Sequence, residues 1–343
     1  MNTARHREDP VPLVIRSTTD SIHAAVVRLC TGGVVAFPTE TVYGLGANAG
    51  NAAAVAKIFE LKGRPADHPL IVHLASALAL ATWAAVVPPA AARLAALFWP
   101  GPLTMILPRA PGVMDAVTGG QATVGVRCPA HPLALQLLRE CAKQGISGLA
   151  APSANRFGHV SPTTAAHVRA EFGADLMVLD GGPAAVGIES TIVDLSGVAP
   201  RILRPGVITE AQIAEALGIA LSRVLEAAPR VSGSLAAHYA PTTALEIVDQ
   251  MQLGARLAQA FIDGQRAVLL ARHPVAATFA TRAQVLEMPT DEAGYAQQLY
   301  AKLREADALA LDLIVVEALP ADARWVALND RLQRAAHGAG RRH

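Results

Sequence analysis

Apolar residues recur at two spacings along the first part of the chain, one typical of helices and one typical of buried strands. The spacing of Ile22, Val26 and Leu29 predicts a helix that begins at Asp20 and ends at Gly32. Further helices are expected at residues 51–62, after 76, at 131–145 and at 210–217. Runs of branched apolar residues predict strands at 34–37, 70–74, 103–108, 122–129, 148–153, 176–180 and 190–195. This irregular mixture favours an α/β domain with a twisted, mixed sheet over residues 10–220.

Strands and helices alternate regularly in the last third of the chain. Strands are expected at 245–249, 267–271 and 313–319, and helices at 252–263 and 292–306. Such alternation is typical of a parallel, doubly wound sheet, so we predict a smaller C-terminal domain over residues 243–337. Between the two domains, residues 221–242 carry Gly, Ser and Pro without a periodic apolar face, and we expect a linker there.

Composition narrows the class of protein. A hydrophobic content of 52% supports two packed cores, and a net charge of +1 argues against tight nucleic-acid binding. Residues 70–92 carry no formal charge and could in length span a bilayer, but Pro88 and Pro89 break them and alanine supplies much of their apolarity. Three scattered cysteines and a polar beginning to the sequence indicate a reducing, cytoplasmic location with no membrane association.

A stretch that packing does not explain carries several basic side chains. Lys62, Arg64, His68 and His73 fall within one short, proline-punctuated segment. Each charge is costly to bury without a partner, so an anionic ligand is expected. Taken alone, Lys62 and Arg64 also fit the basic end of a capped helix, and His73 fits a core histidine.

Other polar groups follow predicted strands, where α/β folds place ligands. Ser153 and Asn155 offer a hydroxyl and an amide at the exit of one strand. Arg127 lies in another strand and must meet an anion if it is buried, for which a substrate carboxylate or a buried Asp or Glu would serve equally.

Four further polar positions and a glycine-rich segment also have ordinary structural explanations. Ser161 fits a helix cap, and Glu40 fits an exposed turn carboxylate. Turn chemistry would account for Glu189 and Arg204. The glycines of GLGANAG at 44–50 are interpreted as a turn, because their spacing departs from a dinucleotide fingerprint. We find no sequence signature of a covalent nucleophile or of a zinc site.

Eight short motifs, taken in their order along the chain, resemble those of a known protein family. FPTETVYGLGA, KGRPADHPLIVH, WPGPLT, VGVRCP, APSANRFG, ESTIVD, LRPG and HYAP occur in sequence. The chain thereby resembles the Sua5/YrdC family of L-threonylcarbamoyladenylate synthases over nearly its whole length. The resemblance implies a YrdC-like N-terminal domain and a Rossmann-like C-terminal domain of the Sua5 type.

The resemblance also implies an activity and a set of site residues. A nucleotidyltransferase of this family joins L-threonine, bicarbonate or CO2, and ATP with Mg2+, and releases pyrophosphate. Its product feeds the t6A modification of tRNA, which other proteins complete. The implied catalytic residues are Lys62, Arg64, Ser153 and Asn155. The implied threonine-binding residues are Thr41, His73, Arg127, Ala151 and Ser190. The implied ATP-binding residues are Arg64, His68, Thr123, Ser153, Ser161, Arg204 and Tyr239, with no metal ligand from the protein.

Two departures and two alternatives qualify this expectation. His68 stands where relatives often carry Asn, and VSGSLAA before HYAP lacks the proline and basic residue of many relatives. Tyr239 is still expected to cover the mouth of the site and exclude water. One alternative is a double-stranded RNA-binding module of the same fold. The other is a carbamoyl-transferring hydrogenase-maturation factor, whose zinc-binding cysteine pairs are missing here.

Overall fold

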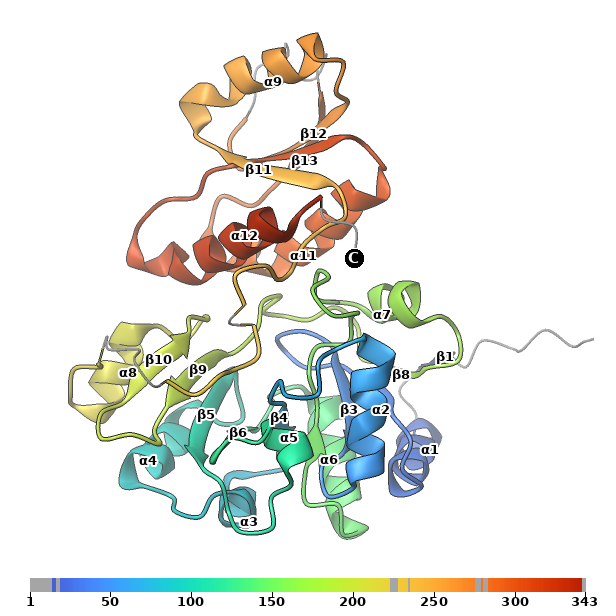
Figure 1. Ribbon diagram of the computed structural model, residues 1–343, viewed down its shortest axis with the longest axis vertical. Helices are drawn as coiled ribbons and strands as arrows, with labels where there is room; N and C mark the ends of the chain where they lie inside the picture. The colour runs from blue at the N-terminus through green and yellow to red at the C-terminus, as the bar shows by residue number, and fades with distance from the viewer. Residues whose placement is uncertain are drawn as a thin grey trace, which may run out of the picture.

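The protein consists of two domains stacked along its long axis (Figure 1). The computed structural model describes residues 14–16, 19–222, 228–233, 235–274, 279 and 283–340. The expected domain start at residue 10, part of the expected linker and the basic tail at 341–343 lie outside the described residues. No helix in the described ranges is long and apolar enough to cross a membrane.

The N-terminal domain is built on a mixed sheet of ten strands in the order β1-β8-β2-β3-β7-β4-β6-β5-β9-β10. The strands are β1 (Val14–Arg16), β2 (Val35–Phe37), β3 (Gly44–Asn48), β4 (Ile71–His73), β5 (Leu103–Pro108), β6 (Thr123–Arg127), β7 (Leu149–Ala150), β8 (Met177–Asp180), β9 (Thr191–Asp194) and β10 (Arg201–Arg204). Parallel and antiparallel pairs both occur, as between β4 and β6 and between β5 and β6. The predicted mixed sheet is therefore confirmed.

Helices cover both faces of this sheet. They are α1 (Thr19–Cys30), α2 (Ala52–Lys62), η1 (Ala77–Ala79), α3 (Leu80–Trp83), α4 (Pro89–Phe98), α5 (Asp115–Thr118), α6 (Pro132–Lys143), α7 (Ala165–Phe172) and α8 (Glu210–Leu217). The α2 helix begins where predicted, because the side chain of Asn51 accepts a hydrogen bond from the Ala54 amide. It ends at Gly63, whose φ of 61° suits the left-handed cap.

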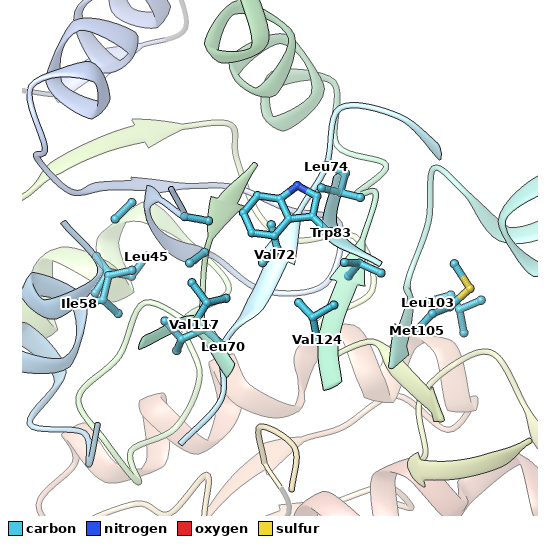
Figure 2. Packing of buried hydrophobic residues seen from close by; sticks show 14 of the residues in the cluster. Leu45, Ile58, Leu70, Val72, Leu74, Trp83, Leu103, Met105, Val117 and Val124 are labelled. Carbon is cyan, nitrogen blue, oxygen red and sulfur yellow. The ribbon is translucent and has the colours of Figure 1, made fainter. Parts of the chain in front are cut away.

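A large apolar core lies on one face of the sheet. Leu45, Val72 and Val124 point from three strands toward Ile58 of α2 and Trp83 of α3 (Figure 2). On the other face, α1 and α6 pack over a separate cluster that includes Phe37, Leu149 and Leu179. The sheet is thus held between two cores, which fixes the ends of its strands and the polar residues there.

The C-terminal domain has a parallel sheet of four strands in the order β11-β14-β12-β13. The elements are β11 (Ala244–Val248), η2 (Gln250–Gln252), α9 (Leu253–Ile262), β12 (Ala267–Ala271), β13 (Ala283–Glu287), α11 (Glu292–Ala308), β14 (Leu313–Glu317), η3 (Ala323–Trp325) and α12 (Val326–Gly338). The α9 helix covers one face, and α11 and α12 cover the face toward the N-terminal domain (Figure 1). This arrangement confirms the predicted doubly wound sheet.

Most of the glycine-rich segment at 44–50 is a strand, so its interpretation as a turn was wrong for residues 44–48 and is confirmed only for Ala49 and Gly50. β3 runs from Gly44 to Asn48 and pairs with β2 and β7. Its glycines lie against the ring of Phe37, and a Cβ on Gly46 would stand 2.6 Å from that ring. The glycines therefore serve close packing inside the sheet rather than a positive φ.

We expect Gly46→Ala to lower the free energy of unfolding by about 1–3 kcal/mol, because the new methyl group must displace the packed ring of Phe37. Gly197→Ala is the matched control, since a Cβ there meets no atom within 4 Å. Urea denaturation of both variants measures the difference. Equal midpoints would show that the glycine is not needed for packing.

Candidate active site

A polar hollow opens between the ends of the N-terminal strands and the linker. It has about 520 Å³ of empty space, counted out to the solvent at its mouth. Several of the residues predicted to form the site line it together: Thr41, Arg64, His73, Arg127, Ala151, Ser153, Ser190, Arg204 and Tyr239. Residues implied for threonine and residues implied for ATP therefore share one cavity.

Lys62 and Asn155 lie beneath this hollow rather than in its lining. The Lys62 ammonium donates to the backbone carbonyls of Ser153, at 2.6 Å, and of Asn155, at 2.5 Å. The Asn155 amide donates to the carbonyl of His159 at 2.9 Å, and its own Oδ1 is buried without a hydrogen-bond partner among the described residues. These two side chains hold the loop after β7 in place, which sets the position of Ser153.

Thr123, His68 and Ser161 lie outside the hollow. Thr123 lines a smaller adjoining hollow of about 270 Å³ of empty space, which shares Ile71 and Ser232 with the first. The His68 ring packs edge-on against Phe157 with 5.4 Å between the ring centroids. The Ser161 hydroxyl is fully buried and donates to a carboxylate, so it is not available to cap a helix.

Three buried cations at one side of the hollow have only neutral hydrogen-bond partners. Arg64 donates to the Pro69 carbonyl and the Ser232 hydroxyl, and Arg204 donates to Ser190 and to the Ser232 carbonyl. Within the described part of the chain, neither these two residues nor Lys62 forms an ion pair. Burial lowers the pKa of Arg64 to about 10 and that of Lys62 well below its usual value. Buried, uncompensated positive charge of this kind favours an anionic ligand.

Arg127 has a carboxylate partner inside the protein. Its guanidinium contacts Glu40 Oε1 at 2.7 Å and the Thr41 hydroxyl at 2.9 Å. Glu40 is only 8% exposed, so its interpretation as an exposed turn carboxylate was wrong. Its second oxygen accepts from the Ala130 amide, which fixes the carboxylate behind the arginine. Arg127 lines the hollow, and the ion pair settles its position there.

The linker supplies lining residues that the sequence analysis did not single out. Ser232, Gly233 and His238 line the hollow beside Tyr239. Tyr239 has a φ of 61°, which is rare for a residue with a side chain, and it is almost fully buried. Its hydroxyl lies close over Gly233, where a Cβ would stand 2.1 Å away. The only sequence signal for His238 was its place next to the tyrosine in HYAP.

Glu189 is also more than a turn residue. It is buried, and its carboxylate accepts hydrogen bonds from Ser161 at 2.6 Å, Tyr300 at 2.8 Å and Arg331 at 2.8 Å. Burial alone would raise its pKa, but Arg331 and Arg204 outweigh that effect and lower the pKa to about 2. Two of its partners come from α11 and α12, so this acid joins the two domains.

Neither buried cysteine lines the hollow, and the described residues form no metal cage. Burial raises the pKa of the Cys128 thiol to about 11 and that of Cys141 to about 12, so both thiols are protonated at neutral pH. Among the described residues, no group of three or more His, Cys, Asp or Glu side chains could hold a metal ion. The site can bind and orient reactants, and it offers fixed positive charge.

Two buried histidines predict how stability depends on pH. Burial lowers the pKa of both His73 and His238 to about 3, so both are neutral when folded at neutral pH. Below about pH 6.5 these two imidazoles bind protons in the unfolded chain but stay neutral in the folded chain. We expect the free energy of unfolding to fall on acidification from pH 6.5 to 4, by about 1.4 kcal/mol per pH unit for each histidine. Replacing both with Gln should flatten the curve; an unchanged slope in urea titrations would contradict the assignment.

Comparison with known proteins places the chain in a family. The Sua5_yciO_yrdC model, described as telomere recombination, matches residues 28–206, and a model described as the threonylcarbamoyl-AMP synthase C-terminal domain matches 208–337. A Bacillus subtilis threonylcarbamoyl-AMP synthase is 41% identical, with 94% of this chain and 95% of that protein covered. A Pyrococcus abyssi threonylcarbamoyl-AMP synthase is 37% identical, with 89% and 90% covered.

The fold of a solved relative agrees with that of this chain along both domains. The crystal structure of P. abyssi Sua5 complexed with L-threonine superimposes with a TM-score of 0.85 at 35% identity, and the match covers 96% of this chain and 98% of that one. The two family models, the full-length relatives and this structure agree. The chain belongs to the Sua5/YrdC family, in its two-domain form.

Proposed function

We propose that the protein is an L-threonylcarbamoyladenylate synthase, a nucleotidyltransferase that makes threonylcarbamoyl-AMP and pyrophosphate from L-threonine, bicarbonate or CO2, and ATP. The observation that carries this proposal is one hollow with two unlike sides. One side has buried cations without acidic partners, and the other has Arg127 held by Glu40. The product would feed the t6A modification of tRNA, and further proteins would complete the transfer.

The triphosphate of ATP suits the side formed by Arg64 and Arg204. Both guanidiniums face the hollow and share the linker residue Ser232 as a hydrogen-bond partner. Phosphate oxygens would supply the negative charge that the protein does not provide there. Lys62 lies one layer deeper and fixes the Ser153 loop, so its contribution is to position that loop and to add positive potential.

L-Threonine suits the opposite side. Arg127 NH1 is held only by the neutral Thr41 hydroxyl, so an amino-acid carboxylate can add to it while Glu40 keeps the guanidinium in place. Ser190, whose hydroxyl hydrogen-bonds Thr104, and the small side chain of Ala151 complete the lining. A relative of the same family is known in complex with L-threonine, which supports this placement.

The proposed chemistry needs no nucleophile from the protein. The amine of threonine attacks the carbon of CO2 and loses a proton to give a carbamate; with bicarbonate the same step releases water. The carbamate oxygen then attacks the α-phosphorus of ATP, and the bond to pyrophosphate breaks as pyrophosphate leaves. Mg2+ would enter the site bound to the phosphates of ATP. The described residues include no cluster of carboxylates that would hold the ion independently. The residues of the hollow orient the reactants, and Arg64 and Arg204 stabilise the charge that collects on pyrophosphate.

The linker would protect the carbamate from water. Tyr239 and His238 are buried at the mouth of the hollow, and the Tyr239 hydroxyl and His238 Nδ1 have no hydrogen-bond partner among the described residues. Unpaired polar atoms at this place are expected to contact substrate. A covered mouth excludes solvent from an intermediate that hydrolyses readily.

The RNA-binding alternative is not favoured. Its affinity would rest on basic side chains spread over an exposed surface. Here the buried cations Arg64 and Arg204 line the hollow, with exposures of only 7% and 4%. A small anion fits that geometry better than a duplex does.

Pyrophosphate release tests the proposed function directly. The full chain is incubated with ATP, Mg2+ and bicarbonate, together with each amino acid in turn. We expect release with L-threonine and formation of threonylcarbamoyl-AMP in the same mixture, seen by mass spectrometry. Release independent of the amino acid, or none with threonine, would overturn the proposal.

Replacing the Arg127 and Glu40 pair should weaken threonine selectively. In the double variant Arg127→Gln with Glu40→Gln no buried charge is left unpaired, so the fold is expected to survive. Loss of a charge-assisted hydrogen bond of about 1.5–3 kcal/mol predicts a KM for threonine about 10-fold to 100-fold higher, with the KM for ATP little changed. Arg109→Gln with Asp115→Asn removes an ion pair outside the hollow and serves as the control. An unchanged KM for threonine would refute the role of Arg127.

A further inference from the structure

A buried ion pair crosses from the N-terminal to the C-terminal domain directly behind the hollow. Glu189 lines the hollow, and its Oε2 lies 2.8 Å from Arg331 Nε of α12. The Arg331 side chain is fully buried and also donates to the Pro205 carbonyl at 3.0 Å, next to Arg204. The C-terminal domain therefore contacts both the acid of the hollow and the end of the strand that carries one of its cations.

Helices α11 and α12 of the C-terminal domain also contact the ring of Tyr239. The Tyr239 ring stacks on Tyr300 of α11, with 5.6 Å between the centroids and 28° between the planes. The Arg331 guanidinium also lies over the Tyr239 ring, with its carbon 5.3 Å from the ring centroid. Tyr300 also donates its hydroxyl to Glu189, so the ring that supports Tyr239 is itself tied to the N-terminal domain.

Tyr239 needs this support because its backbone is strained. A non-glycine residue at a φ of 61° persists only where the surroundings over-determine it. The described ring–ring and cation–ring contacts come from Tyr300, Arg331 and His238, whose ring centroid lies 4.2 Å away, and the hydroxyl lies over Gly233 of the linker. Because Tyr300 and Arg331 belong to the C-terminal domain, the linker conformation depends in part on docking of that domain.

We propose that Tyr300 and Arg331 are positioning residues of the active site, which seat Tyr239 over the nucleotide side of the hollow and anchor Glu189 behind it. The nucleotide subsite is then complete only while the C-terminal domain is docked. This inference rests on the proposed function, since it assigns what the second domain contributes to ATP binding. Neither residue faces the hollow, so each acts through Tyr239 and Glu189 rather than on substrate.

A purely structural ion pair would behave differently from a positioning device. Arg331→Lys keeps a positive charge beside Glu189 but loses the planar guanidinium over the Tyr239 ring. If the pair serves stability alone, Lys should largely rescue the protein. If Arg331 positions Tyr239, the lysine variant stays folded but binds ATP poorly, while the threonine side, which Arg331 does not contact, is less affected.

The experiment measures ATP binding to the full chain by calorimetry and separate KM values for ATP and threonine. For Arg331→Lys we expect ATP affinity to fall about 10-fold or more and the KM for threonine to change less than about 3-fold. Arg324→Lys, an exposed arginine of the same domain paired with Asp322, is the matched control and should match the wild type. Equal ATP affinity in Arg331→Lys and wild type would overturn the inference.

A second pair of variants keeps the test valid if Arg331→Lys does not fold. Tyr300→Phe keeps the stacked ring but loses the hydrogen bond to Glu189, whereas Tyr300→Leu loses both. ATP affinity should therefore fall by about 3-fold to 10-fold in the leucine variant and by less in the phenylalanine variant. Equal ATP affinity in Tyr300→Leu and wild type would count against the inference. Failure of the proposed function is distinguishable, because the wild-type protein itself would then neither bind ATP nor use threonine.

Discussion

Burial of positive charge without acidic partners is the constraint on which the active site depends. Lys62, Arg64 and Arg204 are at most 7% exposed, and their described hydrogen bonds go to carbonyls and hydroxyls. Such an arrangement costs folding free energy, and the close packing of apolar cores on both faces of the sheet offsets that cost. This arrangement creates a positive electrostatic potential in the hollow. In the proposed reaction this potential would favour binding of a polyphosphate and would stabilise the departing pyrophosphate.

Two buried acids form direct ion pairs with other arginines. Glu40 balances Arg127, and Glu189 balances Arg331, each at a contact of 2.7 or 2.8 Å. The protein thus gives Arg127 and Arg331 direct acidic contacts and leaves Arg64 and Arg204, which are proposed to bind the nucleotide, without such a contact. The Glu189 pair also ties the C-terminal domain to the hollow, and the role proposed for this domain is to shape the site through the linker tyrosine.

The sequence predicted the type of both sheets and many of their strands because these depend on local signals. Runs such as residues 70–74 and caps such as Asn51 act over a few residues, whereas Arg64, Arg127 and Tyr239, which line the hollow, were named through the family resemblance. The sequence did not predict that residues 44–48 form a strand, because only the ring of Phe37 from the neighbouring strand explains those glycines. The partners of Glu40 and Glu189 were also missed, since they lie 87 and 142 residues away in the chain.

The central claim is that the hollow holds open cations for a polyphosphate, and thermal stabilisation by ligands tests it most directly. The melting temperature of the full chain is measured with adenosine, ATP and inorganic triphosphate, and again in Arg64→Gln and Arg204→Gln. The account predicts that ATP and triphosphate stabilise the wild type, that adenosine does so far less, and that both variants lose most of the effect. Stabilisation by adenosine equal to that by ATP, or variants that respond like the wild type, would contradict it.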